Sequence, residues 1–264
     1  MEKFLEELKK FPDRERNLRD ITRYSLYDSM WYRTNLWTHS RRVAWIVEEL
    51  SLLAQEVFGD SFDSKKAYIA ALVHDDTEMI IGDIQAGNKA KMEKAELNKL
   101  DILERNAADD LAAKSPQYIG GYEYKELLYH AIDKDSLEAM VIDWADKFDA
   151  FCEALHEIFA GNTSWTKNVV NEYGTILLPT DYYMNYFNKF KEKFPQSAPL
   201  FEKHDPIFTI PTYPAIEKLI VDCTDHTEKS IHQKTGYMPY DLWISLTLKK
   251  GTDEDIKNLY IRKE

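Results

Sequence analysis

The chain has 264 residues, of which 44% are hydrophobic and 13% aromatic, and this content is sufficient for a large hydrophobic core. Its 46 acidic and 34 basic side chains give a net charge of −12, which disfavours general binding to nucleic acids or anionic membranes. The two cysteines, Cys152 and Cys223, exclude a disulfide framework and a cysteine-rich zinc motif. The N-terminus lacks a signal region and no window is apolar enough for a membrane span, so we expect a cytoplasmic protein.

The first predicted helices carry the residues of greatest interest. Hydrophobic side chains at spacings of three and four predict a helix from residue 36 to Gly59, with His39 on its buried face. A second helix is predicted from about Ser64 to Glu78, with Asp63 or Ser64 as its N-cap. This second helix is apolar on nearly all sides, which predicts a central position in the fold.

The later helices are predicted from periodicity and from their stop signals. Residues 92–113 predict an exposed helix rich in charged side chains, and residues 123–131 predict a shorter one. Residues 136–160 have large apolar side chains at helical spacing and are followed by Gly161-Asn162, a typical helix end. A further helix rich in aromatic residues is expected over residues 181–194.

The pattern changes after Pro195, where prolines interrupt short apolar runs. One more helix is expected there, between about residues 214 and 232. The sequence therefore predicts an all-α fold, with a helical domain over residues 1–194 and a less regular extension over residues 195–264.

A group of polar residues stands at the end of the second predicted helix. His74 and Asp75 follow its apolar run, and Glu78 lies one helical turn beyond His74. Acidic side chains are unfavourable at a helix C-terminus, so capping does not explain this group. Two buried histidines and an aspartate form a mixed nitrogen and oxygen ligand set that suits Mn, Fe, Co, Ni or Zn better than Ca.

Each of these residues also has a plain structural interpretation. A histidine on an apolar helix face is commonly a hydrogen-bonded core residue. A His-Asp pair alone is a weak signal, because His204-Asp205 has the same sequence, lies outside any clear helix and is interpreted as a loop. Periodicity does not choose a further carboxylate ligand among Asp143, Asp146 and Asp149.

The order His39, His74-Asp75 and a distant aspartate resembles the HD-domain metal-dependent phosphohydrolases. The stretch HDDTEMIIGDI (residues 74–84) resembles their 5'-deoxynucleotidase branch, in which a glutamate follows the His-Asp pair by three residues and Gly-Asp-Ile/Leu comes next. Further stretches that resemble this branch are ADKFDAFCEALHEIFAGN (residues 145–162), ITRY (residues 21–24) and Arg33-Thr34.

The resemblance implies a set of four metal ligands, which are His39, His74, Asp75 and Asp146. It selects Asp146 through the Ala-Asp-Lys match, and it implies that Glu78 orients or deprotonates the attacking water. It also implies substrate contacts, which are Arg23 at the phosphate, Tyr24 in place of the family's tryptophan, Asp83 near the sugar, and Lys89. Trp37 is, with Tyr24, the aromatic residue that we expect first to stack on a base.

The function that follows is metal-dependent hydrolysis of a (deoxy)nucleoside 5'-monophosphate to nucleoside and phosphate. We expect one divalent ion (Mn, Co, Fe, Ni, Zn or Mg), because His130 and His156 have no convincing partners for a second. The resemblance also implies a homodimer. Two alternatives stay open: hydrolysis of another nucleotide, such as a deoxynucleoside triphosphate or a cyclic or stringent-response nucleotide, and a non-catalytic protein that binds metal and nucleotide.

Overall fold

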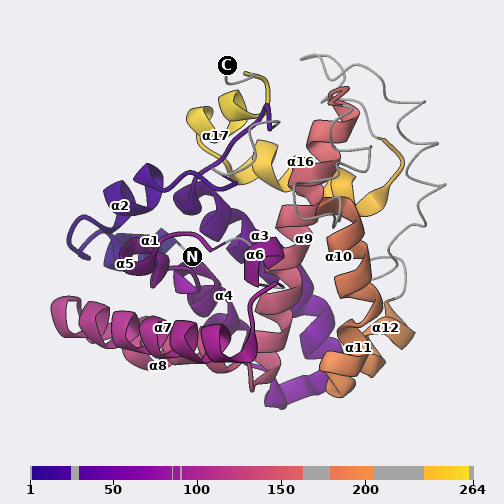
Figure 1. The fold of residues 1–264 in the computed structure, drawn as a ribbon. Coiled ribbons are helices and arrows are strands. Elements are labelled where there is room, and N and C mark those ends of the chain that lie inside the picture. Colours follow the sequence, from indigo (N-terminus) through magenta and orange to yellow (C-terminus); the bar gives the residue numbers. More distant parts are fainter. Residues whose placement is uncertain are drawn as a thin grey trace. The chain divides into compact units, whose positions relative to one another are not determined.

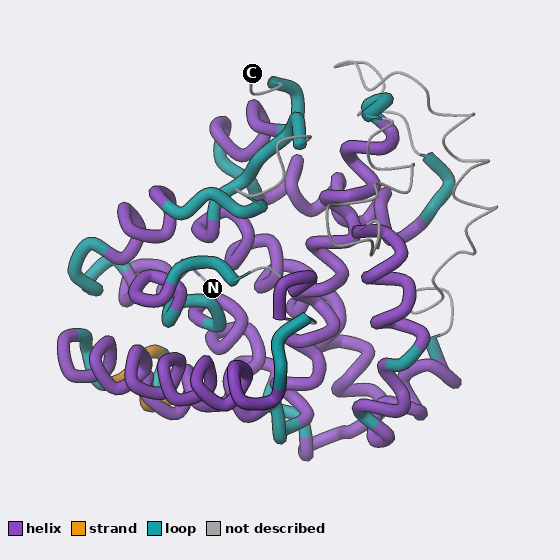
Figure 2. Tube along the Cα trace, in the orientation of Figure 1, coloured by secondary structure: helices purple, strands orange, loops and turns teal. Residues whose placement is uncertain are grey.

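A computed structural model of the chain describes residues 2–24, 30–84, 86–89, 91–162, 179–204 and 235–261. These residues are mostly helical (Figure 2), so the all-α prediction is confirmed. Among them, the extended structure that pairs into a sheet is one small hairpin, in which β1 (Tyr118–Ile119) runs antiparallel to β2 (Tyr122–Glu123). None of the helices in these residues is long and apolar enough to cross a lipid bilayer.

The chain divides into two compact units. The first unit comprises Met1–Tyr24 and Thr34–Ala145, and the second comprises Ser25–Arg33 and Asp146–Glu264. Helix α9 (Leu137–Phe159) is unbroken and contains residues of both units. The domain boundary near residue 195 stays a prediction.

The first unit is a bundle of helices of very different lengths. Figure 1 shows the following elements of this unit: α1 (Glu2–Leu8), α2 (Arg14–Asp20), α3 (Leu36–Phe58), η1 (Gly59–Ser61), α4 (Ser64–Val73), α5 (Glu78–Ile81), α6 (Ala86–Lys89), α7 (Lys94–Lys114) and α8 (Tyr124–Asp133). The long α3 packs along α4, and α8 packs against both α4 and α7.

The centre of this unit is α4, as its composition predicts. Every residue from Ala67 to Val73 is buried, so the helix has no solvent-facing stripe in its last two turns. The neighbouring α3 buries Leu36, Val43 and Ile46 at spacings that follow the helical repeat. His39 belongs to the same face and is 0% exposed, so the predicted inward direction of its ring is confirmed.

The predicted end of α4 at Glu78 is wrong. The helix ends at Val73, four residues of turn follow, and Glu78 begins the separate short helix α5. The backbone N–H groups of Asp76 and Glu78 donate to the carbonyl oxygens three residues earlier, at 3.0 Å each, which is the pattern of tight turns. Residues 74–77 contain no glycine or proline that would end a helix. The helix ends here because the buried side chain of Asp76 makes contacts with other helices.

The other helix ends agree with the sequence within a few residues, with two exceptions. The aromatic helix expected over residues 181–194 is divided into α10 (Pro179–Asn188) and α11 (Phe190–Lys193). The helix expected over residues 214–232 lies outside the described residues.

The second unit contains the rest of α9 and helices from the C-terminal part of the chain. These are α10, α11, η3 (Pro195–Ser197), α12 (Ala198–Lys203), α16 (Met238–Lys250) and α17 (Asp253–Asn258). Its interior contains polar contacts between α9 and α16: Trp243 Nε1 donates to Asp149 Oδ1 at 2.6 Å, and His156 Nδ1 lies 2.9 Å from Tyr240 Oη. His156 Nε2 lies 3.0 Å from the carbonyl oxygen of Leu259.

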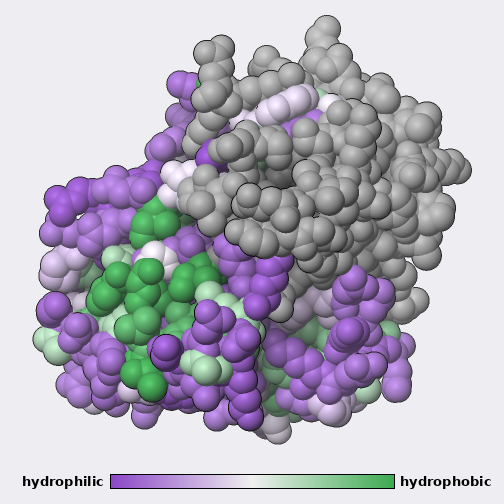
Figure 3. Space-filling model, in the orientation of Figure 1, coloured by the Kyte–Doolittle hydropathy of each residue, from purple (hydrophilic) through white to green (hydrophobic). Residues whose placement is uncertain are grey.

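One face of the first unit exposes hydrophobic side chains. In Figure 3 they gather where α5 and α7 lie in Figure 1. They include Ile80 of α5, which is 48% exposed, and Leu103 of α7, which is 53% exposed.

The N-cap of α4 gives a first prediction. Asp63 Oδ1 accepts the Lys66 N–H at 3.0 Å, and its Oδ2 accepts the Tyr122 hydroxyl at 2.6 Å. We expect Asp63→Ala to lower the free energy of unfolding by about 1 kcal/mol, because an N–H at the helix start loses its acceptor. Urea denaturation measures this change. Tyr122→Phe removes only the hydroxyl contact and should cost less; an Asp63→Ala variant as stable as wild type would contradict the prediction.

Candidate metal centre and active site

Two imidazole rings meet at the end of α4. His39 from α3 and His74, the residue that caps α4, have ring centroids 5.3 Å apart. His74 Nδ1 lies 2.8 Å from the carbonyl oxygen of Ala71. A carbonyl oxygen can only accept a hydrogen bond, so Nδ1 carries the proton of the neutral ring and Nε2 presents its lone pair. This arrangement is the one that ligating histidines adopt.

The carboxylate of Asp75 lies between the two rings. Its Oδ1 is 3.2 Å from His74 Nε2, and its Oδ2 is 3.3 Å from His39 Nε2. The buried Nε2 of His74 makes no hydrogen bond within the described part of the chain. A lone pair that faces a carboxylate oxygen at this distance is repelled unless a proton or a cation lies nearby. The donor set therefore fits a divalent metal ion.

Asp146 adds a further carboxylate to this group. It follows Ala145 directly in the unbroken helix α9. One ligand atom from each of His39, His74 and Asp146 lies within 4.8 Å of the others. Lys147 also donates to Asp146 Oδ2.

The other two aspartates of this helix have different partners. Lys134 donates to Asp143, which is 2% exposed, and Trp243 donates to Asp149, which is 0% exposed. The three aspartates among which periodicity does not choose therefore have different surroundings. Asp146 is the one that is grouped with His39 and His74.

Glu78 begins α5, four residues after His74. Burial raises the pKa of its carboxyl well above the ordinary value, and the nearby charges of Asp75 and Asp83 raise it further. The cations of Arg23 and Lys89 act in the opposite direction. Its buried Oε2 has no hydrogen-bond partner among the described residues. A carboxylate in this environment holds a proton more strongly than one in water, which is a property of a general base.

Arg23 brings a positive charge to the same place. Its Nη1 is 3.7 Å from Asp75 Oδ2, and only 8% of the residue is exposed. The backbone holds it through an N–H that donates to the Thr34 carbonyl oxygen at 3.0 Å. Its Cζ lies 5.3 Å from the ring centroid of Tyr24, whose φ of 54° is unusual for a bulky side chain. Arg23 and Tyr24 are therefore oriented together.

Lys89, at the end of α6, is paired with an acid that the sequence did not suggest. Its Nζ donates to Glu104 Oε1 of α7 at 2.8 Å. Burial lowers the pKa of Lys89, but the carboxylates of Glu104, Glu78 and Asp75 outweigh this, and the pKa lies above its ordinary value. Lys89 is thus held as a cation within electrostatic range of Glu78 and Asp75. Asp83 is the other nearby group, because its charge acts on Glu78.

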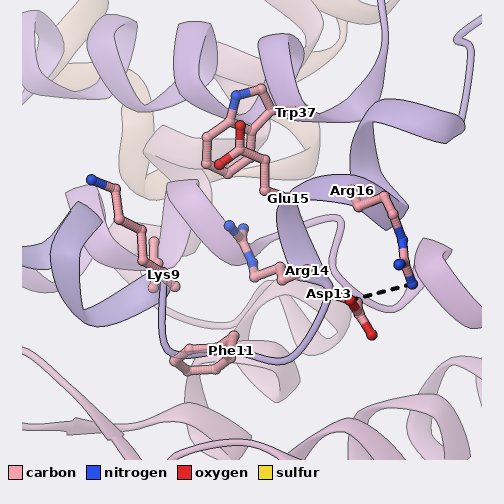
Figure 4. A pocket seen from close by; sticks show the side chains of 8 residues that line it. Lys9, Phe11, Asp13, Arg14, Glu15, Arg16 and Trp37 are labelled. Carbon is pink, nitrogen blue, oxygen red and sulfur yellow. Dashed lines mark ion pairs between the residues drawn. The ribbon is translucent and has the colours of Figure 1, made fainter.

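Trp37 lies apart from this cluster. It lines a cavity of about 210 Å³ together with Phe11 and Arg14 (Figure 4). Three guanidinium groups surround its ring, those of Arg14, Arg19 and Arg41, with Cζ atoms 5.4–5.7 Å from the ring centroid. Trp37 precedes His39 by two residues on α3, so the two side chains leave the helix about 200° apart. This placement does not favour the predicted stacking of Trp37 on a base at the histidine cluster.

The histidines considered for a second metal have other contacts. His130 Nε2 lies 2.6 Å from Lys66 Nζ, and its Nδ1 lies 3.5 Å from Asp135. His156 is occupied at both ring nitrogens by Tyr240 and Leu259. Neither belongs to the metal-ligand group found among the described residues.

No pattern in the sequence assigns a role to Asp76 or indicates its partners. Asp76 is fully buried and contacts Arg14 of α2 and Tyr124 of α8. The distance along the chain between these residues is too large for any spacing argument. The unusual density of acids after His74 was the one available hint.

The site thus contains two imidazoles, aspartate carboxylates, a half-buried glutamate and a guanidinium group. These are the components of a metal-dependent hydrolase site. The comparison with protein families agrees. Residues 10–195 match the model of the YfbR-like 5'-deoxynucleotidases. The chain therefore belongs to this family, whose members are phosphoric ester hydrolases of the 5'-nucleotidase type.

Individual relatives are distant. A 5'-deoxynucleotidase of Vibrio parahaemolyticus is 26% identical over 134 residues, which are 48% of this chain and 64% of that protein. The 5'-deoxynucleotidase YfbR of Salmonella arizonae is 23% identical over 156 residues, which are 58% of this chain and 75% of that protein. The match thus spans about two thirds of the length of these relatives.

A solved structure supports the fold alone. A conserved hypothetical protein from Pyrococcus furiosus superimposes with a TM-score of 0.53 and 21% identity, over 77% of this chain and 95% of that one.

The ligand geometry predicts how metal binding responds to mutation. We expect Asp75→Asn to abolish binding of Co²⁺ at micromolar concentrations, because it replaces a charged oxygen between two histidines by a neutral amide. Isothermal titration calorimetry on protein stripped of metal measures the binding. His130→Gln is the matched control, since it removes an imidazole outside the cluster and should bind Co²⁺ as wild type does. Equal Co²⁺ affinity of Asp75→Asn and wild type would rule out Asp75 as a ligand.

Proposed function

We propose that the chain hydrolyses (deoxy)nucleoside 5'-monophosphates to nucleoside and phosphate with the help of one divalent metal ion. The observation that carries the proposal is the convergence of His39, His74 and Asp75 near the half-buried acid Glu78. The family match supports the reaction class. The choice of a nucleoside monophosphate comes from relatives whose names describe them as 5'-deoxynucleotidases.

In this proposal His39, His74, Asp75 and Asp146 hold the metal. The ion would supply Lewis-acid chemistry to the phosphoryl group and to the attacking water. A pair of neutral imidazoles with two carboxylates suits Mn, Co, Fe, Ni or Zn. Mg is the alternative, a harder cation that prefers oxygen ligands. The environment supports this set, because His74 Nδ1 is already committed to the Ala71 carbonyl oxygen and its Nε2 is available.

Glu78 accepts the proton of the attacking water. Its raised pKa makes it a stronger base than an exposed glutamate, while Arg23 and Lys89 keep the carboxylate form accessible. Proton acceptance by a carboxylate distinguishes hydrolysis from binding, since a protein that only binds nucleotides has no need of it.

Arg23 binds the non-bridging phosphate oxygens, because its guanidinium group lies beside the metal-ligand carboxylate of Asp75 and carries a permanent charge. Lys89 adds a second positive charge to the phosphate side. Asp83 and Tyr24 contact the sugar in this proposal, and Tyr24 replaces the tryptophan of the related enzymes. The homodimer and the cytoplasmic location expected from the sequence stay predictions.

The proposal is tested by phosphate release from a panel of 5'-ribo- and 5'-deoxyribonucleotides. Protein stripped of metal is reloaded in turn with Mn²⁺, Co²⁺, Mg²⁺ and Zn²⁺, and Asp75→Asn serves as the control. We expect release from monophosphates that depends on the metal and is absent in the control. Release of triphosphate or pyrophosphate from a deoxynucleoside triphosphate, with no action on monophosphates, would contradict the proposed substrate.

Glu78 gives a sharper prediction, since its role differs from that of the ligands. We expect Glu78→Gln to lower kcat by about 10²- to 10⁴-fold, the usual contribution of a general base. The affinity for Co²⁺ should stay close to that of wild type, because the amide keeps the shape of the side chain. Steady-state kinetics and calorimetry on the same preparation measure both quantities. A kcat near that of wild type would remove Glu78 from the mechanism.

A further inference from the structure

Asp76 is the acid of the His74–Glu78 turn that has no part in the proposed function. Its side chain is fully buried, at 0% exposure. A buried carboxylate destabilises the fold unless opposite charge and hydrogen bonds compensate it. The partners of Asp76 therefore indicate what the turn needs from this residue.

Two helices that are distant in the sequence supply these partners. Arg14 of α2 donates from Nη2 to Asp76 Oδ1 and from Nε to Asp76 Oδ2, each at 2.7 Å. Tyr124 of α8 donates its hydroxyl to Asp76 Oδ2, also at 2.7 Å. Arg14 is 3% exposed and Tyr124 is 1% exposed. Such a two-pronged contact fixes the direction of a carboxylate as well as neutralising its charge.

Arg14 also binds the end of α4. Its Nη2 donates to the carbonyl oxygen of Leu72 at 2.5 Å, one of the carbonyl groups that a helix leaves without an internal partner. The carbonyl oxygens on either side, those of Ala71 and Val73, are contacted by His74 Nδ1 at 2.8 Å and by the Asp76 N–H at 3.0 Å. His74 and Asp75 thus lie between two points that Arg14 holds together.

We propose that Arg14, Asp76 and Tyr124 are positioning residues that set the metal affinity of the site. The inference rests on the proposed function, because it takes His74 and Asp75 as metal ligands. Asp75 directly precedes Asp76, so a rotation of the Asp76 backbone moves the Asp75 carboxylate. The distances of 3.2 and 3.3 Å from that carboxylate to the two Nε2 atoms would then change. Metal-ligand bonds tolerate changes of only about 0.2 Å.

The surroundings of Arg14 allow conservative changes. On its outer side the residue borders the 210 Å³ cavity, and its Cζ lies 5.7 Å from the ring centroid of Trp37 (Figure 4). Arg14→Lys keeps the positive charge, loses the planar guanidinium group that makes the two parallel contacts, and leaves space that water can enter. Tyr124→Phe is milder still, because it removes one hydroxyl group and keeps the ring.

The test compares the affinity for Co²⁺ and Mn²⁺ with the stability of the metal-free protein. We expect Tyr124→Phe and Arg14→Lys to bind both ions about 10- to 100-fold more weakly than wild type, the range found when a residue that supports metal ligands is changed. Arg14→Lys should show the larger effect, since it loses the fork. Calorimetry gives the dissociation constants, and urea titration gives the midpoint of unfolding.

Phe11→Leu separates positioning from general stability. Phe11 packs edge-on against the ring of Tyr124, with centroids 4.8 Å apart, and takes no part in the hydrogen bonds to Asp76. This variant should unfold at a lower urea concentration and bind Co²⁺ as wild type does. The positioning role is overturned if Tyr124→Phe and Arg14→Lys keep the wild-type affinity for Co²⁺. It is also overturned if Phe11→Leu lowers the urea midpoint as much as these two variants do and weakens Co²⁺ binding as much. A wild-type protein that binds neither ion would instead overturn the proposed function, and the positioning role with it.

Discussion

The hydrogen bond between His74 Nδ1 and the Ala71 carbonyl oxygen determines what the centre of this protein can do. It uses a carbonyl group that the end of α4 leaves free, and it fixes both the tautomer and the direction of the ring. The residues of α4 are buried over its last two turns, and the side chain of His74 that follows is 7% exposed. The Nε2 lone pair therefore lies beside the carboxylate of Asp75 and near the ring of His39.

The same helix end imposes an electrostatic constraint. Carbonyl dipoles make a helix C-terminus negative, and this one is followed by the acids Asp75, Asp76 and Glu78. Cations offset these acids: Arg14 pairs with Asp76, Arg23 lies near Asp75, and Arg23 and Lys89 both lower the pKa of Glu78. Three cations thus lie among the acids that follow α4, in a protein with a net charge of −12. A phosphate group and a metal ion both suit such a balance of charges.

The sequence predicted the parts of this arrangement that depend on local periodicity or on a matched motif. The direction of His39 followed from the apolar face of its helix, and the central position of α4 followed from its composition. The end of α4 did not, because the contacts that break the helix come from Arg14 and Tyr124, which no local pattern connects to Asp76. Glu104 was missed for the same reason, since its partner Lys89 lies on another helix.

Asp146 is a residue of the second unit and lies on α9. Asp146 is followed on this unbroken helix by Asp149 and His156, and these residues bond to Trp243 and Tyr240 of α16. Buried hydrogen bonds of this kind fix the rotation of a helix about its axis, and with it the direction of Asp146. The match to the family model ends at residue 195, so α16 lies beyond the part of the chain that the family shares. Within the second unit, the contacts of α9 with α16 therefore help to orient the candidate ligand Asp146.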